Sequence, residues 1–505
     1  MTEGPTRNFH THGASLASRA PHISMIDLTT DAAAFLRKAA HLATEHLKTL
    51  DDRSRPVTQT LSPAELHKKL GLKLPEAGRE LDSLLKDVSN VLKYSVRTGH
   101  PRFMNQLFGG YDPAAILGDW IAAVINTSMY TYEAAPVATL MEQILIGRMT
   151  RMVGFESGEG TFAPGGSVSN LMAVLAARQR AVPSARQTGL RGDEKLVMFV
   201  SAEGHYSLDR AAVVGGLGLD AVVKVEVDEV GRMRPDALER AMQAEVDAGR
   251  RPFLVGCTSG STVPGAFDPL DQIGPIAKRH GAWFHVDASY GGSVLFSDEH
   301  RDLMKGVDQA DSVSWNPHKM MGVPLTCSAI LLREPGRLSG TFGMHAEYLF
   351  HDDPEEDPTC CDLGDMTLQC GRRVDALKLW LSWQAMGDQG FGQRVDSMFG
   401  LARDLADEIK SRKGFELTRE PMGANVCFRY LPPALRNEEG KSRLEHQTRI
   451  TLAVRSQMLR DGRFMVNFAM LDGAQVFRPA LTNPHTTLED LTLMLDEIER
   501  CAIEL

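Results

Sequence analysis

The spacing of apolar residues changes along the chain and divides it into regions. From Asp31 to about Leu92, apolar residues recur at three- and four-residue steps, as in "DAAAFLRKAAHLATEHLKTL", which predicts amphipathic helices. Ser62 followed by Pro63 is typical of an N-cap and a first helical residue. Polar stretches join these helices, which have no core of their own. We therefore expect them to pack on a larger body or on a second subunit.

From about residue 140, short β-branched runs alternate with helical stretches such as 169–182 and 235–249. This alternation predicts an α/β fold in which helices cover both faces of a mostly parallel sheet. Ligands of such sheets bind beyond the carboxyl ends of the strands. The runs expected to be buried strands are 196–202, 222–227, 252–260, 283–289, 312–317 and 327–332.

A long amphipathic helix over 371–387 precedes a second, smaller α/β pattern. Its strands are expected near 424–431 and 474–481 and its last helix over 488–501, and the charged stretch 436–449 is interpreted as a solvated loop and helix face. We expect three parts: an N-terminal helical segment (1–100, flexible to about residue 25), a large domain (101–375) and a small C-terminal domain (376–505).

Composition narrows the possible partners and compartment. The 505 residues carry a net charge of −10, which argues against nucleic acid or a membrane as the main partner. No window approaches the ~18 apolar residues of a membrane span, and the N-terminus lacks the apolar part of a secretory signal. The seven cysteines show no zinc-type spacing, so we expect reduced thiols in a cytoplasmic protein and no metal site.

Four polar features follow predicted strands. Lys319, in "SVSWNPHKMMG", lies among apolar neighbours, where a lysine must be paired, neutral or covalently used. Asp287 needs a cationic partner if it is buried, or else caps a turn. His205 is either structural or stacks on an aromatic ligand. "FAPGGSVSN" opens a helix with Gly166 and Ser167, which either bind phosphate or only cap the helix.

Pyridoxal phosphate (PLP) requires all four features at once. A lysine holds the cofactor as an imine, and an acid keeps its pyridine ring protonated so that the ring draws electrons from the substrate. A histidine stacks on the ring, and a helix N-terminus receives the phosphate. Because one α/β region contains all four, the sequence predicts PLP as the cofactor.

Several longer motifs resemble one family, the group II PLP-dependent amino-acid decarboxylases, and within it the branch that acts on glutamate, aspartate and cysteine sulfinate. The resemblance covers about four fifths of the chain, from His100 to the C-terminus. It implies the aspartate-aminotransferase-like fold (fold type I) and a homodimer with active sites at the subunit interface. The motifs are "NPHKMMGVPLTCSAILL", "FAPGGSVSN", "HYSLDRAA", "FHVDASYGG", "NTSMYTYEAAP" and "CGRRVDALKLWLSWQAMGDQG".

The resemblance also implies roles for individual residues. Lys319 is expected to be the imine lysine, Asp287 to pair with the pyridine nitrogen and His205 to stack on the ring. The remaining implied cofactor contacts are Gly166, Ser167, Ser314 and His318 at the phosphate, and Ser261 where the family commonly has threonine.

Three further residues are implied to contact the substrate. Arg478, in "VFRPAL", matches the arginine that holds the α-carboxylate, and Gln106 matches a residue of the substrate pocket. Phe108 stands where glutamate decarboxylases usually have a small hydroxyl residue. A bulky side chain shortens the pocket, so we expect cysteine sulfinate or aspartate as substrate, with glutamate as the alternative; one methylene changes specificity by only ~1–3 kcal/mol.

Two departures from the family pattern bear on the chemistry. Relatives carry a proton-donating tyrosine in a mobile loop, but this chain has no tyrosine between Phe350 and Asp365. Protonation then falls to His205, a loop cysteine or water, or the reaction is diverted to an aldehyde-forming oxidative deamination. Ser289-Tyr290 also replaces the usual Ala-Trp. A non-catalytic relative is disfavoured because Lys319 and Asp287 are both present.

Overall fold

The computed structural model describes residues 31–344, 346, 362–433 and 440–503. The expected flexible N-terminus, to about residue 25, lies outside these residues. The chain divides into two compact units, each described here by itself. The first unit comprises Met1–Lys48 with Ser62–Tyr94, and the second comprises Thr49–Leu61 with Ser95–Leu505.

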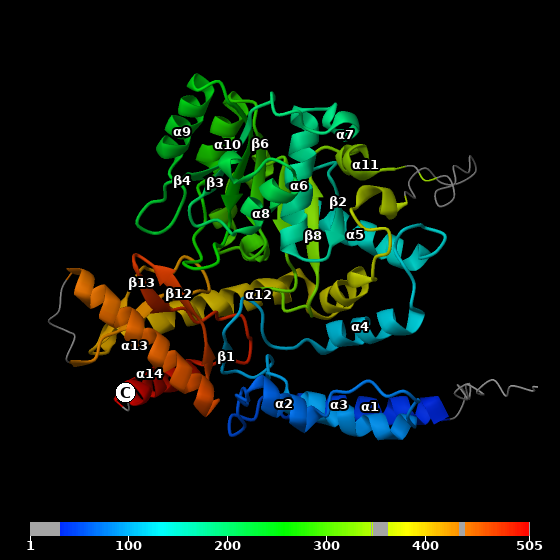
Figure 1. Cartoon of the computed structure of the whole chain (residues 1–505), viewed down its shortest axis with the longest axis vertical. Coiled ribbons are helices and arrows are strands. Elements are labelled where there is room, and N and C mark those ends of the chain that lie inside the picture. Colours follow the sequence, from blue (N-terminus) through cyan, green and yellow to red (C-terminus); the bar gives the residue numbers. More distant parts are fainter. Residues whose placement is uncertain (1–30, 345, 347–361, 434–439, 504–505) are drawn as a thin grey trace, which may run out of the picture. The chain divides into compact units, whose positions relative to one another are not determined.

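The first unit contains three helices, α1 (Asp31–Lys48), α2 (Pro63–Leu70) and α3 (Leu81–Tyr94) (Figure 1). The expected start of α2 is confirmed, because the Ser62 side chain accepts a hydrogen bond from the Glu65 amide in a capping box. None of the described side chains of the three helices is fully buried. The helices therefore form no core of their own, as their sequence predicts.

A seven-stranded sheet forms the centre of the second unit (Figure 1), in the order β2-β8-β7-β6-β5-β3-β4. Only β8 runs in the opposite direction to the other six strands, so the expected mostly parallel α/β sheet is confirmed. Its strands are β2 (Glu159–Ala163), β3 (Leu196–Ser201), β4 (Val222–Val225), β5 (Arg251–Thr258), β6 (Trp283–Ala288), β7 (Ser312–Trp315) and β8 (Ser328–Leu332). The sequence pattern did not predict β2.

Helices cover both faces of this sheet. Val197 and Phe199 of β3 point into one apolar cluster and Met198 and Val200 into another, because successive strand residues face opposite sides. Helices α5 (Pro136–Val153), α9 (Pro235–Asp247), α10 (Leu270–Arg279) and α12 (Asp375–Ser411) contribute to the first cluster. Helices α6 (Gly166–Ala181), α7 (Ala185–Thr188), α8 (Ser207–Val214) and α11 (Arg337–Phe342) contribute to the second.

Strand register brings three polar residues together at one end of the central strands of the sheet. Thr258 at the end of β5 is paired with Asp287 of β6, and Asp287 is paired with Ser314 of β7. These strands are parallel, so the three side chains lie next to one another on the same face. This is the carboxyl end of the sheet, where ligands of α/β folds bind.

A second, four-stranded antiparallel sheet has the order β12-β13-β10-β9. It shares one hydrophobic core with the large sheet, so the expected division at residue 375 stays a prediction. Its strands are β9 (Phe415–Leu417), β10 (Phe428–Tyr430), β12 (Phe468–Leu471) and β13 (Ala474–Phe477). The other elements are α4 (Pro113–Ile125), α13 (Gly440–Asp461), α14 (Leu488–Ile503), and the 3-10 helices Leu219–Ala221, Gly291–Phe296, Arg301–Met304, Val307–Gln309 and Leu363–Met366.

Helix α12 is longer than its sequence pattern predicts. It continues past the expected end at residue 387 because only Gly387 leaves the helical conformation, with φ 62°, and a second helical stretch follows directly. No helix of the described residues is long and apolar enough to cross a membrane.

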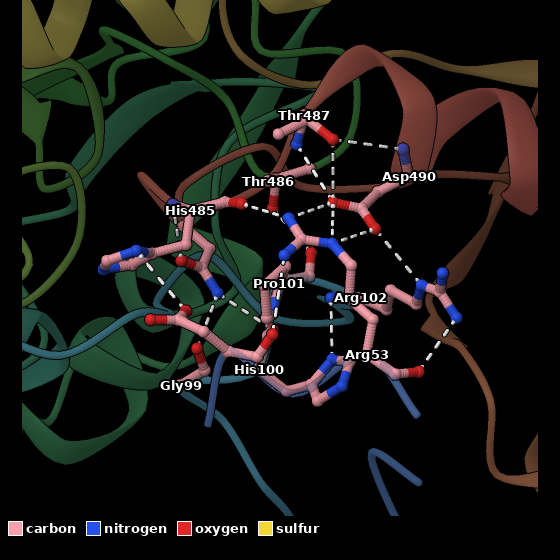
Figure 2. Close-up of polar contacts among 11 residues, drawn as sticks. Arg53, Gly99, His100, Pro101, Arg102, His485, Thr486, Thr487 and Asp490 are labelled. Atoms are coloured by element: carbon pink, nitrogen blue, oxygen red, sulfur yellow. Dashed lines mark hydrogen bonds and ion pairs between the residues drawn. The ribbon is translucent and has the colours of Figure 1, made fainter. Parts of the chain in front are cut away.

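The buried carboxylate of Asp490 helps to fix residues 99–104. This segment precedes Gln106 and Phe108, which the sequence predicts to be in the substrate pocket. Asp490, 1 % exposed, accepts hydrogen bonds from Arg53 Nη2 (2.8 Å) and Arg102 Nε (3.2 Å), as Figure 2 shows. Thr486 also binds the Pro101 carbonyl (2.6 Å). Strand β1 (Phe103–Met104) follows directly and pairs with β11 (Met465–Val466), so residues 99–104 are held against the C-terminal part of the chain.

We predict that Asp490→Asn lowers the free energy of unfolding by about 3 kcal/mol, because it leaves two arginines beside a buried neutral amide. Burial alone would raise the pKa of Asp490, but the hydrogen bonds from Arg53, Thr487 and Arg102 lower it below its ordinary value. The stabilisation is therefore complete above the unfolded-state pKa and is lost as the pH falls through the folded-state pKa. Urea unfolding at several pH values measures the difference.

The matched control is Asp496→Asn on the same helix, where a 52 % exposed carboxylate pairs with Arg412. Its cost should stay below about 1 kcal/mol. Equal losses in the two variants would contradict the role of Asp490.

Candidate active site

A cavity of about 260 Å³ lies at the carboxyl ends of β5, β6 and β7. Six of the residues singled out in the sequence line it, namely Gly166, Ser167, His205, Asp287, His318 and Lys319. The chain segments that carry them are far apart in sequence and meet because parallel strands end at one edge.

Lys319 follows a tight turn after β7. Its amide donates to the Asn316 carbonyl (3.0 Å), and the Asn316 amide donates to the Ser289 carbonyl (3.2 Å). The Nζ atom makes no hydrogen bond or ion pair with any described residue. Burial lowers the pKa of Lys319, Asp287 acts to raise it and Arg478 lowers it further. A lowered pKa increases the fraction of Lys319 that is the neutral amine, the form that attacks a carbonyl carbon, while the charged form pairs electrostatically with Asp287.

Asp287 is buried yet remains ionised. Burial acts to raise its pKa, but Lys319 and the hydrogen bonds from Ser289 and Asn170 bring the pKa below its ordinary value. The Ser289 amide donates to Oδ1 (3.1 Å), and the Asn170 side-chain amide donates to Oδ2 (2.7 Å). The cavity therefore contains a fixed negative charge that suits a protonated ring nitrogen.

The N-terminus of α6 forms a close-fitting cradle. Gly165 has φ 108°, a conformation that favours glycine, and no side chain caps the helix. A Cβ atom on Gly166 would lie 2.7 Å from both Asn316 Nδ2 and Ser289 Oγ, so only glycine fits. Backbone N–H groups at such a helix start bind phosphate, and Ser167 adds a hydroxyl.

Both histidines of the cavity are neutral. His205 Nδ1 accepts a hydrogen bond from the Ser207 amide (3.2 Å), and burial lowers its pKa. The proton of the neutral ring is therefore on Nε2. Burial and then Lys319 lower the pKa of His318 to about 4. His318 Nδ1 lies 3.1 Å from the Cys327 amide nitrogen, which fixes the ring next to Lys319.

Two predicted cofactor contacts are not on the cavity wall. Ser314 was expected at the phosphate, but its hydroxyl is within hydrogen-bond distance of Asn170 Oδ1 (2.8 Å) and Asp287 Oδ1 (3.1 Å). It therefore contacts the carboxylate end of the site, because its strand places it beside Asp287. Ser261 is buried, and its Oγ accepts from the Ala266 amide (3.0 Å).

Arg478 follows β13 and is 4 % exposed. Its Nε and Nη1 atoms have no hydrogen-bond partner among the described residues, and neither has the hydroxyl of Tyr290, which lines the cavity. The charge of Arg478 acts on both Lys319 and Tyr290. A buried guanidinium without an anion is costly, so this arrangement suits a ligand with a carboxylate.

None of the three expected substrate contacts, Arg478 included, is on the cavity wall within one chain. Gln106 is exposed, and Phe108 packs on Phe103 with ring centroids 6.0 Å apart. The loop that lacks the family tyrosine lies mostly outside the described residues, which resume at Asp362.

Sequence reasoning missed several residues that line the cavity: Asn170, Thr258, Gly260, Thr262 and Asn316. Most of them lie at the end of β5 or within a few positions after the end of β5 or β7, and that position is a usable signal. Thr258 Oγ1 is buried and has no partner within the described part of the chain, so it is available to a ligand.

These features fit PLP: an amine without a partner, a buried carboxylate, a neutral histidine and a glycine-walled helix start. Residues 63–431 match the family described as the pyridoxal-dependent decarboxylase conserved domain. The chain is thus a PLP-dependent amino-acid decarboxylase. It belongs to the pyridoxal-dependent decarboxylase family, as the sequence motifs predict.

The relatives agree with this assignment. Human cysteine sulfinic acid decarboxylase is 45 % identical over 90 % of this chain and 92 % of its own. Acidic amino acid decarboxylase GADL1 of Bos taurus is 42 % identical over 92 % of this chain and 90 % of its own. A crystal structure of mouse CSAD superposes with a TM-score of 0.89 at 42 % identity, covering 94 % of this chain and 99 % of that one. The expected fold class is confirmed.

We predict that Gly166→Ala weakens the binding of PLP by at least about tenfold, because the new methyl group must displace Asn316 or Ser289. Equilibrium titration of the apoprotein, followed by cofactor absorbance, measures the effect. Gly400→Ala on α12, where a Cβ meets no atom within 4 Å, is the control and should bind normally. Unchanged affinity in Gly166→Ala would place the phosphate elsewhere.

Proposed function

We propose that this enzyme removes the α-carboxylate of an acidic amino acid, with cysteine sulfinate (to hypotaurine) or aspartate (to β-alanine) as its substrates. The observation that carries the proposal is the buried Arg478. Its Nε and Nη1 atoms lack hydrogen-bond partners among the described residues, and its charge lowers the pKa of Lys319. Its guanidinium is a fork-shaped donor for a carboxylate. The relatives named cysteine sulfinic acid decarboxylase and acidic amino acid decarboxylase GADL1 support this substrate class.

Each cavity residue has a role in this proposal. Lys319 binds the cofactor covalently, Asp287 faces its ring nitrogen, His205 lies against the ring, and Gly166, Ser167 and His318 surround the phosphate. Once bound, the cofactor withdraws electrons from the bond between Cα and the carboxylate. Arg478 orients that carboxylate.

Substrate length is the finer part of the proposal. Gln106 and Phe108 are assigned to the substrate pocket, and the bulk of Phe108 favours a C3 or C4 acid over glutamate. Glutamate remains the alternative substrate, since a single methylene contributes only ~1–3 kcal/mol to discrimination.

The second candidate reaction is a decarboxylation coupled to oxidative deamination, in which O2 accepts two electrons and CO2, ammonia, hydrogen peroxide and an aldehyde are released. The absence of tyrosine between Phe350 and Asp365 motivates it.

The same absence bears on the amine-forming decarboxylation. Without the tyrosine as donor, the proton that Cα needs in that reaction comes from His205, a loop cysteine or water.

We further propose that the enzyme is a homodimer whose active sites lie at the subunit interface. Helix α4 exposes apolar side chains at one-face spacing, namely Leu117, Trp120, Ile121 and Val124, and α5 exposes Val137, Leu140 and Ile144 in the same way. Such stripes are typical of a surface that another chain covers. A second subunit also accounts for Gln106 and Phe108, which do not line the cavity of their own chain.

The cytoplasm is the proposed compartment. The structure shows no disulfide among the described cysteines, four of which are buried, as expected for a reducing environment.

The test of the reaction is a product assay with cofactor-loaded protein and each of four substrates: cysteine sulfinate, cysteate, aspartate and glutamate. We expect equal amounts of CO2 and amine, largest with a C3 or C4 acid. Lys319→Ala should abolish turnover, and Phe108→Ser should shift the preference toward glutamate. Ammonia and aldehyde in place of amine would establish the oxidative reaction instead, and a wild-type preference for glutamate would refute the role of Phe108.

The dimer is tested with Val124→Lys, which places a charge on the α4 stripe (Val124 is 76 % exposed). We expect light scattering after gel filtration to report a dimer for the wild type and a monomer for the variant, because burying an unpaired charge is costly. Val246→Lys on α9, 41 % exposed, is the control and should remain dimeric. A dimeric Val124→Lys would exclude this face.

A further inference from the structure

A continuous chain of buried hydrogen bonds extends from Asp287 into the sheet. The Asn170 side-chain amide donates to Asp287 Oδ2 (2.7 Å) and to Ser207 Oγ (2.8 Å). Asn170 Oδ1 accepts from Ser314 Oγ (2.8 Å) and contacts His285 Nε2 (3.1 Å). Asn170 thus uses all four of its hydrogen-bonding positions, although it is 1 % exposed.

The ionised carboxylate of Asp287 sets the direction of the hydrogen bonds in this network. An ionised carboxylate can only accept, so the amide nitrogen of Asn170 must face Asp287 and its oxygen must face His285. His285 Nε2 therefore carries a proton and donates it. The His285 side chain is fully buried, and burial lowers its pKa to about 4, so the ring is neutral.

A neutral His285 has an unprotonated Nδ1, which must accept. Its partner is Ser312 Oγ at 2.9 Å. Ser312 Oγ itself accepts from Trp283 Nε1–H at 2.7 Å. Every hydrogen bond from Trp283 through Ser312, His285 and Asn170 is therefore donated toward Asp287.

Strand periodicity explains how the sequence places these groups together. Trp283, His285 and Asp287 alternate along β6 and share one face, and the register pairs His285 with Ser312 and Asp287 with Ser314. Asn170 lies on α6, which covers this face. A connected line of buried polar groups through the sheet needs a reason beyond packing, because each buried polar group costs free energy if it is left unpaired.

We propose that Asn170 and His285, with Ser312 and Trp283 behind them, are positioning residues that hold Asp287 ionised and aimed at the ring nitrogen of the cofactor. Aligned hydrogen-bond donors polarise one another in a low-dielectric interior. The hydrogen-bond chain therefore stabilises the charge of Asp287 without a second cation besides Lys319. The inference rests on the proposed role of Asp287 in cofactor binding. It adds four residues to which the motifs gave no role.

The test compares two ligands for the apoprotein: PLP and an analogue in which carbon replaces the ring nitrogen. Only PLP can pair with Asp287, whereas both ligands react with Lys319 and both carry the phosphate. For Asn170→Ala we expect the Kd of PLP to rise about tenfold or more, as for the loss of a hydrogen bond to a charged group. The Kd of the analogue should change less than about twofold, a difference that a general folding defect cannot produce.

A matched pair of serine variants tests the far end of the chain. Ser312→Ala interrupts the link between Trp283 and His285. Ser293→Ala removes an equivalent buried acceptor from Trp315 (3.1 Å) that has no link to Asp287. Ser312→Ala should lower the affinity ratio of PLP to the analogue, and Ser293→Ala should leave it unchanged.

His285→Gln, which retains a side-chain N–H donor, should keep more of the wild-type ratio than His285→Leu. If the wild type binds both ligands equally, Asp287 does not pair with the ring and the proposed function is at fault. If the wild type discriminates and Asn170→Ala and Ser312→Ala discriminate equally well, the positioning chain is refuted and the function stands.

Discussion

The buried negative charge of Asp287 determines which chain segments must meet at the carboxyl end of the sheet. Removing a carboxylate from water costs several kcal/mol even after the protein relaxes. The structure offsets this cost with the charge of Lys319, the Ser289 amide and the side chain of Asn170. Each partner comes from a different segment, so the ends of β6 and β7 and the start of α6 must be placed together. The same placement forms the cavity.

This constraint explains which parts of the molecule the sequence predicted. Continuous apolar β-branched runs bury a strand on both faces, and the strands from β3 to β8 lie within a few residues of their expected positions. The run "EGTFA" of β2 is short and begins with Glu159 and Gly160, so it carries no such signal. It is a strand because its backbone pairs with β8, which is a tertiary effect.

The residues of the active site also divide into those that the sequence predicted and those that only the fold brings together. Lys319, Asp287 and His205 each belong to a local motif, and all three line the cavity. Asn170 donates to Asp287 across 117 positions, a contact that only the register of strand and helix creates. The family resemblance implied that Ser314 contacts the phosphate, but its strand pairing with Asp287 places its hydroxyl beside Asn170 Oδ1 and the carboxylate. Local motifs therefore indicated the chemistry, while the fold decided the partners.

The polar groups that lack partners in the described chain indicate what the site still needs. Thr258 Oγ1, the Tyr290 hydroxyl and two nitrogens of Arg478 are buried without hydrogen bonds, although most buried polar groups in proteins are paired. Each such group destabilises the free protein, and a ligand that supplies an acceptor removes that cost on binding. The guanidinium of Arg478 and the N-terminus of α6, which no side chain caps, both favour anions. An amino acid with a carboxylate, bound next to a phosphorylated cofactor, satisfies both places at once, which neither ligand alone can do.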